Sequence, residues 1–253
     1  TLSLHDALPI YVEYEVINKG KDFVIGDIHY DSRKIKENDV FCALIGAVTD
    51  GHNYIEKAVN SGAKMVIAEK KDITVADKDV TYIFVDNLRK HLGVIASNFF
   101  GWPQKKLKII GITGTNGKTT SSYILDSMLE NTSRIGTIGY KILDEEIEAP
   151  NTTPESLDLV KMLDKSLKKG VEYFIMEVSS HALEIGRVDM LEFDSVMFTN
   201  LTQDHLDYHE NMENYFNAKF KLFSMLRNKD AAAVNIDDSY GERIYNSNKS
   251  YKS

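Results

Sequence analysis

The residues with the clearest chemical potential lie between Lys108 and Thr120, which read KIIGITGTNGKTT. The short apolar run at the start predicts a buried strand, and apolar residues spaced three and four apart after Thr119 predict an amphipathic helix. The glycine-rich turn between them would let backbone N–H groups surround phosphate oxygens, and the helix N-terminus would add partial positive charge. This stretch therefore predicts a nucleoside triphosphate site, in which Lys118 reaches the outer phosphates and the Thr119 hydroxyl binds Mg²⁺.

The loop departs from the general phosphate-loop pattern at one position. That pattern has its first glycine five positions before Gly117, where this chain has Ile112. The alternative is an ordinary glycine-rich turn followed by a surface lysine. The position of Gly-Lys-Thr between a predicted strand and a predicted helix favours the nucleotide site.

Two further candidates follow predicted strands at 173–178 and 195–199. Ligands gather at the carboxyl ends of parallel strands, so we expect Glu177 and His205 to lie near the glycine-rich turn. A carboxylate after Tyr-Phe-Ile-Met is costly to bury unless it meets a cation or a hydrogen-bond donor, and a metal ion would meet that need. The alternative is a charge that turns into solvent. Near His205, Asp207 and His209 are further possible ligands, each of which could also be an ordinary loop residue.

Lys219 lies within the apolar stripe of a helix predicted from His209 to Leu226. It follows Phe216 by three positions and precedes Phe223 by four, so it is expected to point inward. Burial lowers the pKa of a lysine, and its neutral amine can react with CO₂ to give a carbamate that faces Mg²⁺. The alternative is a lysine whose stem packs inward while its ammonium group reaches solvent.

The rest of the chain predicts the elements that position these groups. Strands at 40–45, 65–68 and 82–85 alternate with a helix at 54–60 and another that Asn87 caps, so residues 11–103 are expected to form a small α/β domain. Residues 101–104 predict a hinge. Residues 104–253, in which strands and helices also alternate, predict a mainly parallel sheet flanked by helices, and a further strand is expected at 231–235. Residues 1–10 fit neither pattern and are interpreted as a non-native or atypical start.

Composition excludes several classes of protein. The formal charge of the 253 residues is −8 and no basic stripe occurs, so a nucleic-acid partner is not expected. Cys42 is the only cysteine, which excludes an intramolecular disulfide and fits a reducing compartment. No apolar run has the length of a membrane span. We therefore expect a cytoplasmic protein that does not insert into membranes. A monomer is expected as well, although no pattern in the sequence determines the oligomeric state.

Several motifs together resemble the Mur ligase family, over roughly residues 11–226. They are Gly114 to Thr120, Asn151 to Pro154, Glu177 to His181, Asn200 to His209, and Ala218-Lys219. The motif Asp31-Ser32-Arg33, with Asp39-Val40-Phe41 and Asp50-Gly51-His52 after it, is similar to the branch of this family that adds the third amino acid of a muramoyl peptide. Several long motifs that match together are far more specific than one alone.

The resemblance implies a UDP-sugar-binding N-terminal domain, a central ATP-binding domain, and ATP and Mg²⁺ as cofactors. ATP is expected on Gly114, Thr115, Asn116, Gly117, Lys118, Thr119 and Thr120. The UDP part is expected on Tyr30, Ser32, Ala47, Val48 and Thr49, of which the last three match by position more than by identity. The muramoyl-peptide part is expected on Asn151, Thr152, Thr153, Ser179 and Arg187. Lys219 would be the carbamylated lysine of the family, and Thr119, Glu177 and His205 would be the other Mg²⁺ ligands.

The reaction that the resemblance implies is ATP-dependent amide formation. The D-glutamate carboxylate of UDP-N-acetylmuramoyl-L-alanyl-D-glutamate would attack ATP to give an acyl phosphate, which a diamino acid, diaminopimelate or L-lysine, converts to an amide. Mg²⁺ and Lys118 would offset the repulsion between the two anions. The family has a third domain for the incoming amino acid, so this chain is expected not to complete the ligation alone. The alternatives are a related Mur or folylpolyglutamate ligase, a phosphate-loop kinase or GTPase, and a non-catalytic UDP-sugar- or nucleotide-binding module.

Overall fold

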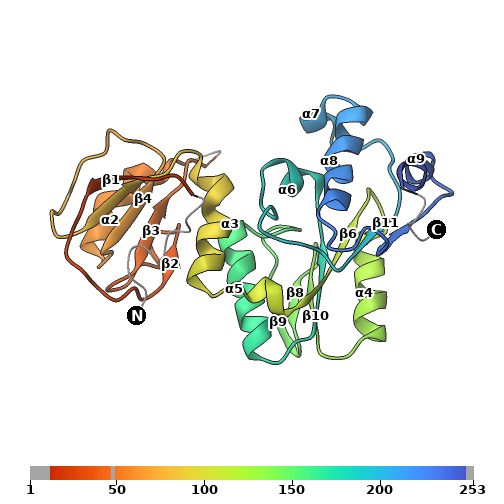
Figure 1. The fold of residues 1–253 in the computed structure, drawn as a ribbon, viewed down its shortest axis with the longest axis horizontal. Coiled ribbons are helices and arrows are strands. Elements are labelled where there is room, and N and C mark those ends of the chain that lie inside the picture. The colour runs from red at the N-terminus through yellow and green to blue at the C-terminus, as the bar shows by residue number, and fades with distance from the viewer. Residues whose placement is uncertain (1–11, 47–48, 249–253) are drawn as a thin grey trace. The chain divides into compact units, whose positions relative to one another are not determined.

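The structure is a computed structural model that describes residues 12–46 and 49–248 (Figure 1). The described residues fall into two compact units that divide between Gly101 and Trp102. The atypical start at 1–10 and two of the predicted UDP-binding residues, Ala47 and Val48, lie outside the described residues. None of the helices in the described part of the chain is both long and apolar enough to cross a membrane.

The first unit is built on a sheet to which the described residues contribute five strands, in the order β1-β5-β4-β3-β2. The strands are β1 (Glu15–Asn18), β2 (Ile28–His29), β3 (Val40–Ala43), β4 (Met65–Ala68) and β5 (Thr81–Phe84). Only the pairing of β1 with β5 is antiparallel. The helices are η1 (Gly51–Tyr54), α2 (Ile55–Asn60) and α3 (Leu88–Phe99). The predicted strands β3, β4 and β5 are confirmed, whereas β1 and β2 are short edge strands without a long apolar run and were not predicted.

Asn87 does not cap α3 in the predicted way. Its backbone is left-handed, with φ of 47°, and its side chain makes no capping hydrogen bond. The helix instead gains its stability from burial, because Leu88, Leu92 and Ile95 lie on one buried face. The spacing of apolar residues therefore predicted the helix correctly, whereas the prediction that the Asn87 side chain caps it was wrong.

The second unit contains a sheet of seven strands within the described residues, in the order β12-β11-β6-β10-β7-β8-β9. They are β6 (Lys108–Thr113), β7 (Thr132–Ile135), β8 (Tyr140–Ile142), β9 (Glu145–Ile147), β10 (Tyr173–Glu177), β11 (Ser195–Phe198) and β12 (Ala232–Val234). The first five in the spatial order are parallel, and β8 and β9 are antiparallel. The predicted mainly parallel sheet is confirmed. The strand β7 was not predicted, because Thr-Ser-Arg-Ile looks polar although all four residues are buried.

The helices of the second unit are η2 (Pro103–Lys106), α4 (Lys118–Met128), α5 (Ser156–Lys168), α6 (Ser180–Glu184), α7 (Leu206–His209), α8 (Met212–Ser224) and α9 (Ser239–Ser247). The helix α4 packs against β6, β7 and β10, and α8 packs against β6 and α6 (Figure 1). The helix predicted from 209 to 226 is wrong at its start. Glu210 has a φ of 66°, and the Asn211 side chain accepts a hydrogen bond from Asn214 N at 2.8 Å, so a new helix begins at Met212.

The register of the central strands brings the candidate residues to one edge of the sheet. Glu177 on β10 lies opposite Ile112 on β6, and Phe198 on β11 lies opposite Thr113. Most residues of the three strands are buried and apolar, as expected for parallel strands covered on both faces. The loops that follow them, which begin at residues 114, 178 and 199, therefore leave the sheet side by side.

Candidate functional site

The glycine-rich loop joins β6 to α4 at this edge of the sheet. Gly114 and Gly117 have φ of 145° and 84°, which L-residues with side chains rarely adopt. A Cβ on Gly114 would lie 1.9 Å from Thr199 Oγ1, so the loop has room only for glycine there. The first N–H groups of α4, from Lys118 onward, have no acceptor within the helix. Together with the partial positive charge of the helix end, they form an anion-binding arrangement.

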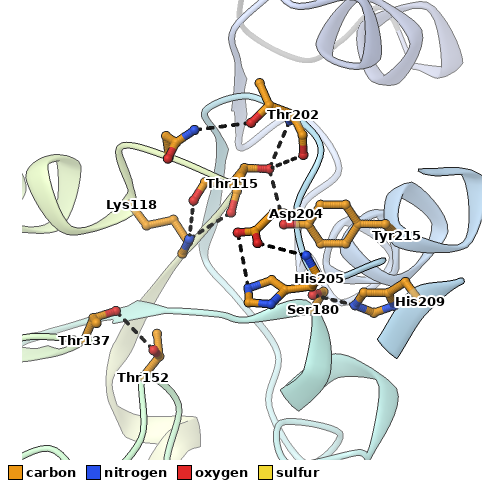
Figure 2. Close-up of polar contacts among 12 residues, drawn as sticks. Thr115, Lys118, Thr137, Thr152, Ser180, Thr202, Asp204, His205, His209 and Tyr215 are labelled. Carbon is orange, nitrogen blue, oxygen red and sulfur yellow. Dashed lines mark hydrogen bonds and ion pairs between the residues drawn. The ribbon is translucent and has the colours of Figure 1, made fainter. Parts of the chain in front are cut away.

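The segment after β11 fixes the shape of this loop. Asn200 accepts a hydrogen bond from Asn116 N through Oδ1 at 3.0 Å, and its Nδ2 donates to Asn116 O at 3.1 Å. The Asn200 carbonyl accepts from Thr115 N at 2.9 Å. The Thr115 hydroxyl also donates to Thr202 O and contacts the Tyr215 hydroxyl (Figure 2). The loop is therefore held in its shape by residues more than 80 positions away in the sequence.

The ammonium group of Lys118 lies against the loop. It donates to the carbonyl oxygens of Gly114 and Thr115 at 2.9 and 2.8 Å (Figure 2). Burial lowers the pKa of Lys118, and the negative charges of Glu177 and Asp204 act in the opposite direction. Lys118 therefore lies within electrostatic reach of two carboxylates, that of Glu177 at the end of β10 and that of Asp204 in the segment after β11.

Lys219 points inward, as predicted, and its side chain does not reach solvent. The residue is 2% exposed, and its Nζ donates to Gly114 O at 2.9 Å, across 105 residues of sequence. It also lies 4.5 Å from the centre of the Tyr215 ring. Burial, with repulsion from Lys118 as a smaller cause, lowers the pKa of Lys219 to about 7, against the opposing charge of Asp204. The amine is therefore partly neutral near neutral pH.

Glu177 is completely buried, which excludes the alternative of a charge that turns into solvent. Its Oε1 accepts from Thr137 N at 3.2 Å and its Oε2 accepts from Thr137 Oγ1 at 3.0 Å. A Cβ on Gly136 would lie 2.1 Å from Oε1, so only glycine leaves room for the carboxylate. Sequence reasoning missed Gly136 and Thr137. The Gly-Thr pair directly after β7 could have indicated them, but β7 was itself not predicted.

The motif around His205 divides into exposed and buried residues. His205 has a φ of 53°, its side chain is 63% exposed, and its Nε2 lies 3.4 Å from Asp204 Oδ2 (Figure 2). Asp207 is exposed. His209 is buried and its Nε2 pairs with Ser180 Oγ at 2.8 Å, and burial lowers the pKa of His209. His209 is thus already engaged by a hydroxyl, so the structure favours its ordinary packing role.

The residues proposed for Mg²⁺ do not form a ready-made metal centre. Within residues 12–46 and 49–248, no three His, Cys, Asp or Glu side chains are grouped closely enough to hold a metal ion. Mg²⁺ in nucleotide sites commonly binds one or two carboxylates together with phosphate oxygens and water. The buried carboxylate of Glu177, near Lys118 and the start of α4, fits a Mg²⁺ site of this kind, in which phosphate oxygens and water supply the other ligands. Thr119 is the second residue of α4, so it lies at the same helix end.

The predicted muramoyl-peptide residues gather around the end of β10. Thr153 Oγ1 donates to Glu177 O at 3.0 Å and accepts from Ser179 N at 3.1 Å, and Arg187 Nη1 donates to Thr153 O at 2.9 Å. Thr152 Oγ1 lies 3.1 Å from Thr137 Oγ1 (Figure 2). Asn151 is held through its carbonyl, which accepts from the Tyr140 hydroxyl. The structure therefore brings together all five predicted residues of this set, which are Asn151, Thr152, Thr153, Ser179 and Arg187.

The predicted UDP-binding residues belong to the first unit. Ser32 is buried, and the neighbouring Asp31 and Arg33 form an ion pair at 2.7 Å. Thr49 O accepts a hydrogen bond from Gly46 N at 2.9 Å. Tyr30 follows β2 directly. Their role in binding UDP stays a prediction.

A hollow of about 550 Å³ opens beside the glycine-rich loop, between the start of α4 and the carboxyl ends of β11 and β12. It is lined by residues that include Gly117, Thr120, Phe198, Val234 and Asn235. Asn235 Nδ2 donates to Thr199 O at 2.8 Å, which ties the end of β12 to the end of β11. Sequence reasoning did not include Asn235. The hollow places a mainly apolar surface next to the anion-binding helix end, as a nucleoside would require.

Comparison with known proteins gives consistent matches in both units. Residues 112–253 match the family model for the Mur ligase middle domain, and residues 24–100 match that for the Mur ligase family catalytic domain. Over 237 residues the chain is 57% identical to the UDP-N-acetylmuramoyl-L-alanyl-D-glutamate--2,6-diaminopimelate ligase of Fusobacterium nucleatum. The match covers 92% of this chain and 48% of that protein. Identity to the protein of the same name from Clostridium tetani is 48% over 238 residues, with the same coverage.

A solved structure of a protein with this name is similar over 99% of the chain, with a TM-score of 0.74 and 27% sequence identity, and the match covers 50% of that protein. The chain thus spans about half the length of the curated relatives it matches.

Proposed function

This chain belongs to the Mur ligase family, because the family's middle-domain model matches more than half of the chain. From that premise we propose that the chain carries the nucleotide-binding and carboxylate-activating part of an ATP-dependent ligase. The proposed acceptor is UDP-N-acetylmuramoyl-L-alanyl-D-glutamate and the proposed amino acid is diaminopimelate, as in the names of its relatives. One observation carries the proposal. Lys118 and Lys219 both donate to the carbonyl oxygen of Gly114, within a loop that ends at an open helix N-terminus.

ATP is proposed to bind along the loop and the adjoining hollow. The N–H groups at the start of α4 and the residues from Gly114 to Thr120 would hold the phosphates, because helix N-termini favour anions. The hollow beside Gly117 would hold the base and ribose. In this proposal the γ-phosphate would lie near Lys118 and Glu177, which interact electrostatically.

The chemistry requires two anions to meet. The acceptor carboxylate attacks the γ-phosphorus of ATP, which releases ADP and gives an acyl phosphate, and an amine then displaces phosphate to form the amide. Lys118 stabilises the charge that spreads over the transferring phosphoryl oxygens, and the fixed loop holds the reactants in line. The protein therefore contributes positioning and electrostatic stabilisation and needs no covalent nucleophile.

Bound Mg²⁺ would neutralise phosphate charge, with Thr119, Glu177 and His205 as its proposed protein ligands. Lys219 is the fourth proposed ligand, after its neutral amine has reacted with CO₂ to give a carbamate and a proton. This reaction would remove the repulsion between Lys219 and Lys118 and replace it with attraction, because an anion would then lie beside the Lys118 ammonium group.

Residues in each unit are proposed to bind one part of the acceptor. Asn151, Thr152, Thr153, Ser179 and Arg187 in the second unit would bind its muramoyl-peptide part. Tyr30, Ser32, Ala47, Val48 and Thr49 in the first unit would bind its UDP part. The first unit is accordingly proposed as the UDP-sugar-binding domain and the second as the ATP-binding domain, with the reaction in the cytoplasm, where nucleotide-linked sugars are made.

Calorimetric titration of the chain tests the nucleotide site. A non-hydrolysable ATP analogue with Mg²⁺ is expected to bind the wild type, and Lys118→Met is expected to abolish that binding. The matched control is Lys108→Met, because Lys108 is an exposed lysine at the opposite end of β6, paired with Glu172. Absence of binding to the wild type, or unchanged binding by Lys118→Met, would refute the site.

A second titration tests the acceptor. UDP-N-acetylmuramoyl-L-alanyl-D-glutamate is expected to bind more tightly than UDP alone, and a folate is expected not to bind. Preference for a folate would instead favour a folylpolyglutamate ligase. Equal affinity for UDP and for the full acceptor would leave the muramoyl-peptide residues without a role.

A further inference from the structure

Among the described residues, Thr137 supplies the hydrogen bonds to the Glu177 carboxylate. Thr137 donates to one carboxylate oxygen through its backbone N–H and to the other through its hydroxyl. The two residues are 40 positions apart and lie at the ends of the adjacent strands β7 and β10. The Gly136 position leaves no room for a side chain beside Oε1. The Gly136-Thr137 turn therefore determines where the carboxylate lies.

The direction of a third hydrogen bond follows from the first two. A threonine hydroxyl has one proton, and that of Thr137 is used in the bond to Glu177 Oε2. In the contact of 3.1 Å between the hydroxyls of Thr137 and Thr152, Thr152 must then be the donor (Figure 2). A directed chain of hydroxyl groups thus runs from Thr152 through Thr137 to Glu177.

Thr152 lies in a segment that is itself held on both sides. The Asn151 carbonyl accepts from the Tyr140 hydroxyl, and the Thr153 carbonyl accepts from Arg187. The Thr153 hydroxyl donates to the backbone of Glu177 at 3.0 Å. The segment 151–153 and the Glu177 carboxylate are therefore joined both through the backbone of β10 and through the two hydroxyl groups.

We propose that Thr137 is a positioning residue that couples the segment 151–153 to the Glu177 carboxylate, with Thr152 setting the direction of its hydroxyl group. This inference rests on the proposed function, because the carboxylate matters to catalysis only if a nucleotide and its cation bind beside it. Hydrogen bonds in such a chain strengthen one another, so an acceptor that orders Thr152 also orders Glu177. Thr137 thereby links occupancy of the acceptor segment to the readiness of the nucleotide site.

Three threonine variants test this role. Thr137→Val keeps the shape of the side chain and removes its hydroxyl, and it is expected to weaken Mg²⁺-dependent binding of a non-hydrolysable ATP analogue by about tenfold, as for loss of a hydrogen bond to a charged group. Thr137→Ser keeps the hydroxyl and is expected to retain affinity within about twofold. The matched control is Thr132→Val, since Thr132 Oγ1 also donates to a carboxylate, that of Asp126, at 2.5 Å and on the same strand β7. It is expected to lose folding stability and to keep nucleotide affinity.

Crystal structures of the same chains without nucleotide give a second measurement. The Glu177 carboxylate is expected to leave its position in Thr137→Val and to keep it in Thr137→Ser. An unmoved carboxylate in Thr137→Val, or equal nucleotide affinity of Thr137→Val and wild type, would overturn the inference. If the wild type binds no nucleotide, the proposed function fails, and the position of Glu177 in Thr137→Val then decides the inference by itself.

Discussion

The burial of Lys219 should make the stability of the second unit rise with pH, and Lys219→Met should remove the part of that rise that Lys219 contributes. Lys219 is 2% exposed, and its ammonium group shares the carbonyl of Gly114 with a second cation, Lys118. These surroundings lower its pKa from 10.5 to about 7. Methionine has a stem of similar length and no charge, so the substitution removes the titrating group and keeps most of the packing.

The sign and size of the effect follow from proton linkage. Between about pH 7 and about pH 10.5 the unfolded chain holds a proton on this lysine that the folded chain has lost, so the free energy of unfolding rises with pH in that window. The slope is at most about 1.4 kcal/mol per pH unit, and integration from about pH 7 to about pH 9 gives a rise of about 2 kcal/mol. Near pH 7 the lowered pKa of Lys219 still reduces the free energy of unfolding of wild type by about 4 kcal/mol. Loss of the hydrogen bond from Lys219 to Gly114 O costs only ~1 kcal/mol, so Lys219→Met should be more stable than wild type.

Urea unfolding in buffers free of CO₂ measures this dependence. Trp102 is the only tryptophan of the chain and lies in the second unit, so its fluorescence follows the unfolding of that unit. Lys221→Met is the matched control, because Lys221 lies on the same helix with its side chain 50% exposed and paired with Glu184. Wild type and Lys221→Met should share the rise with pH. Lys219→Met should show a smaller rise, because the pKa of the buried Lys118 is also lowered and its contribution remains.

The refuting result is the same rise in wild type and Lys219→Met. The lysine would then titrate near its ordinary pKa in the folded chain, and the argument for a neutral amine would fail. A lower stability of Lys219→Met near neutral pH would show that the contacts with Gly114 and Tyr215 outweigh the penalty for burying the charge.

Two other predictions concern the loop and the buried histidine. Gly114→Ala should lose nucleotide binding and destabilise the second unit strongly, because its Cβ would meet Thr199 Oγ1 at 1.9 Å. The control Gly170→Ala, at a φ of 83° with open space around it, should lower the free energy of unfolding by about 1 kcal/mol. Equal losses of stability for the two variants in urea unfolding would contradict this. Ser180→Ala should destabilise the second unit by about 1–3 kcal/mol, since His209 Nε2 loses its buried partner, and an unchanged unfolding midpoint would show that the bond contributes nothing.

Local pattern was sufficient for much of the fold. The apolar runs of β4, β6 and β10 predicted strands within one residue of their observed bounds, because buried parallel strands carry little but apolar side chains. Local pattern failed where a buried segment carries polar residues. The strand β7 is buried although three of its four residues are polar, and Arg134 within it is 1% exposed over the Tyr123 ring.

The candidate site shows the same division. The position of Lys219 within an apolar helical stripe predicted its burial, whereas His205 and His209, four residues apart in one polar motif, could not be separated by pattern. His205 lies exposed just before α7, whereas His209 at the end of α7 is buried and pairs with Ser180.

Residue types and periods along the chain were enough to predict the strand, loop and helix that are proposed to bind phosphate, because glycine backbone freedom and helix-end charge are local properties. They could not predict which distant groups meet. The contact of Lys219 with Gly114 spans 105 residues and that of Thr137 with Glu177 spans 40. Such pairs depend on the order and register of the strands, which arise when the whole sheet packs, so the surroundings of each charge are known only from the folded chain.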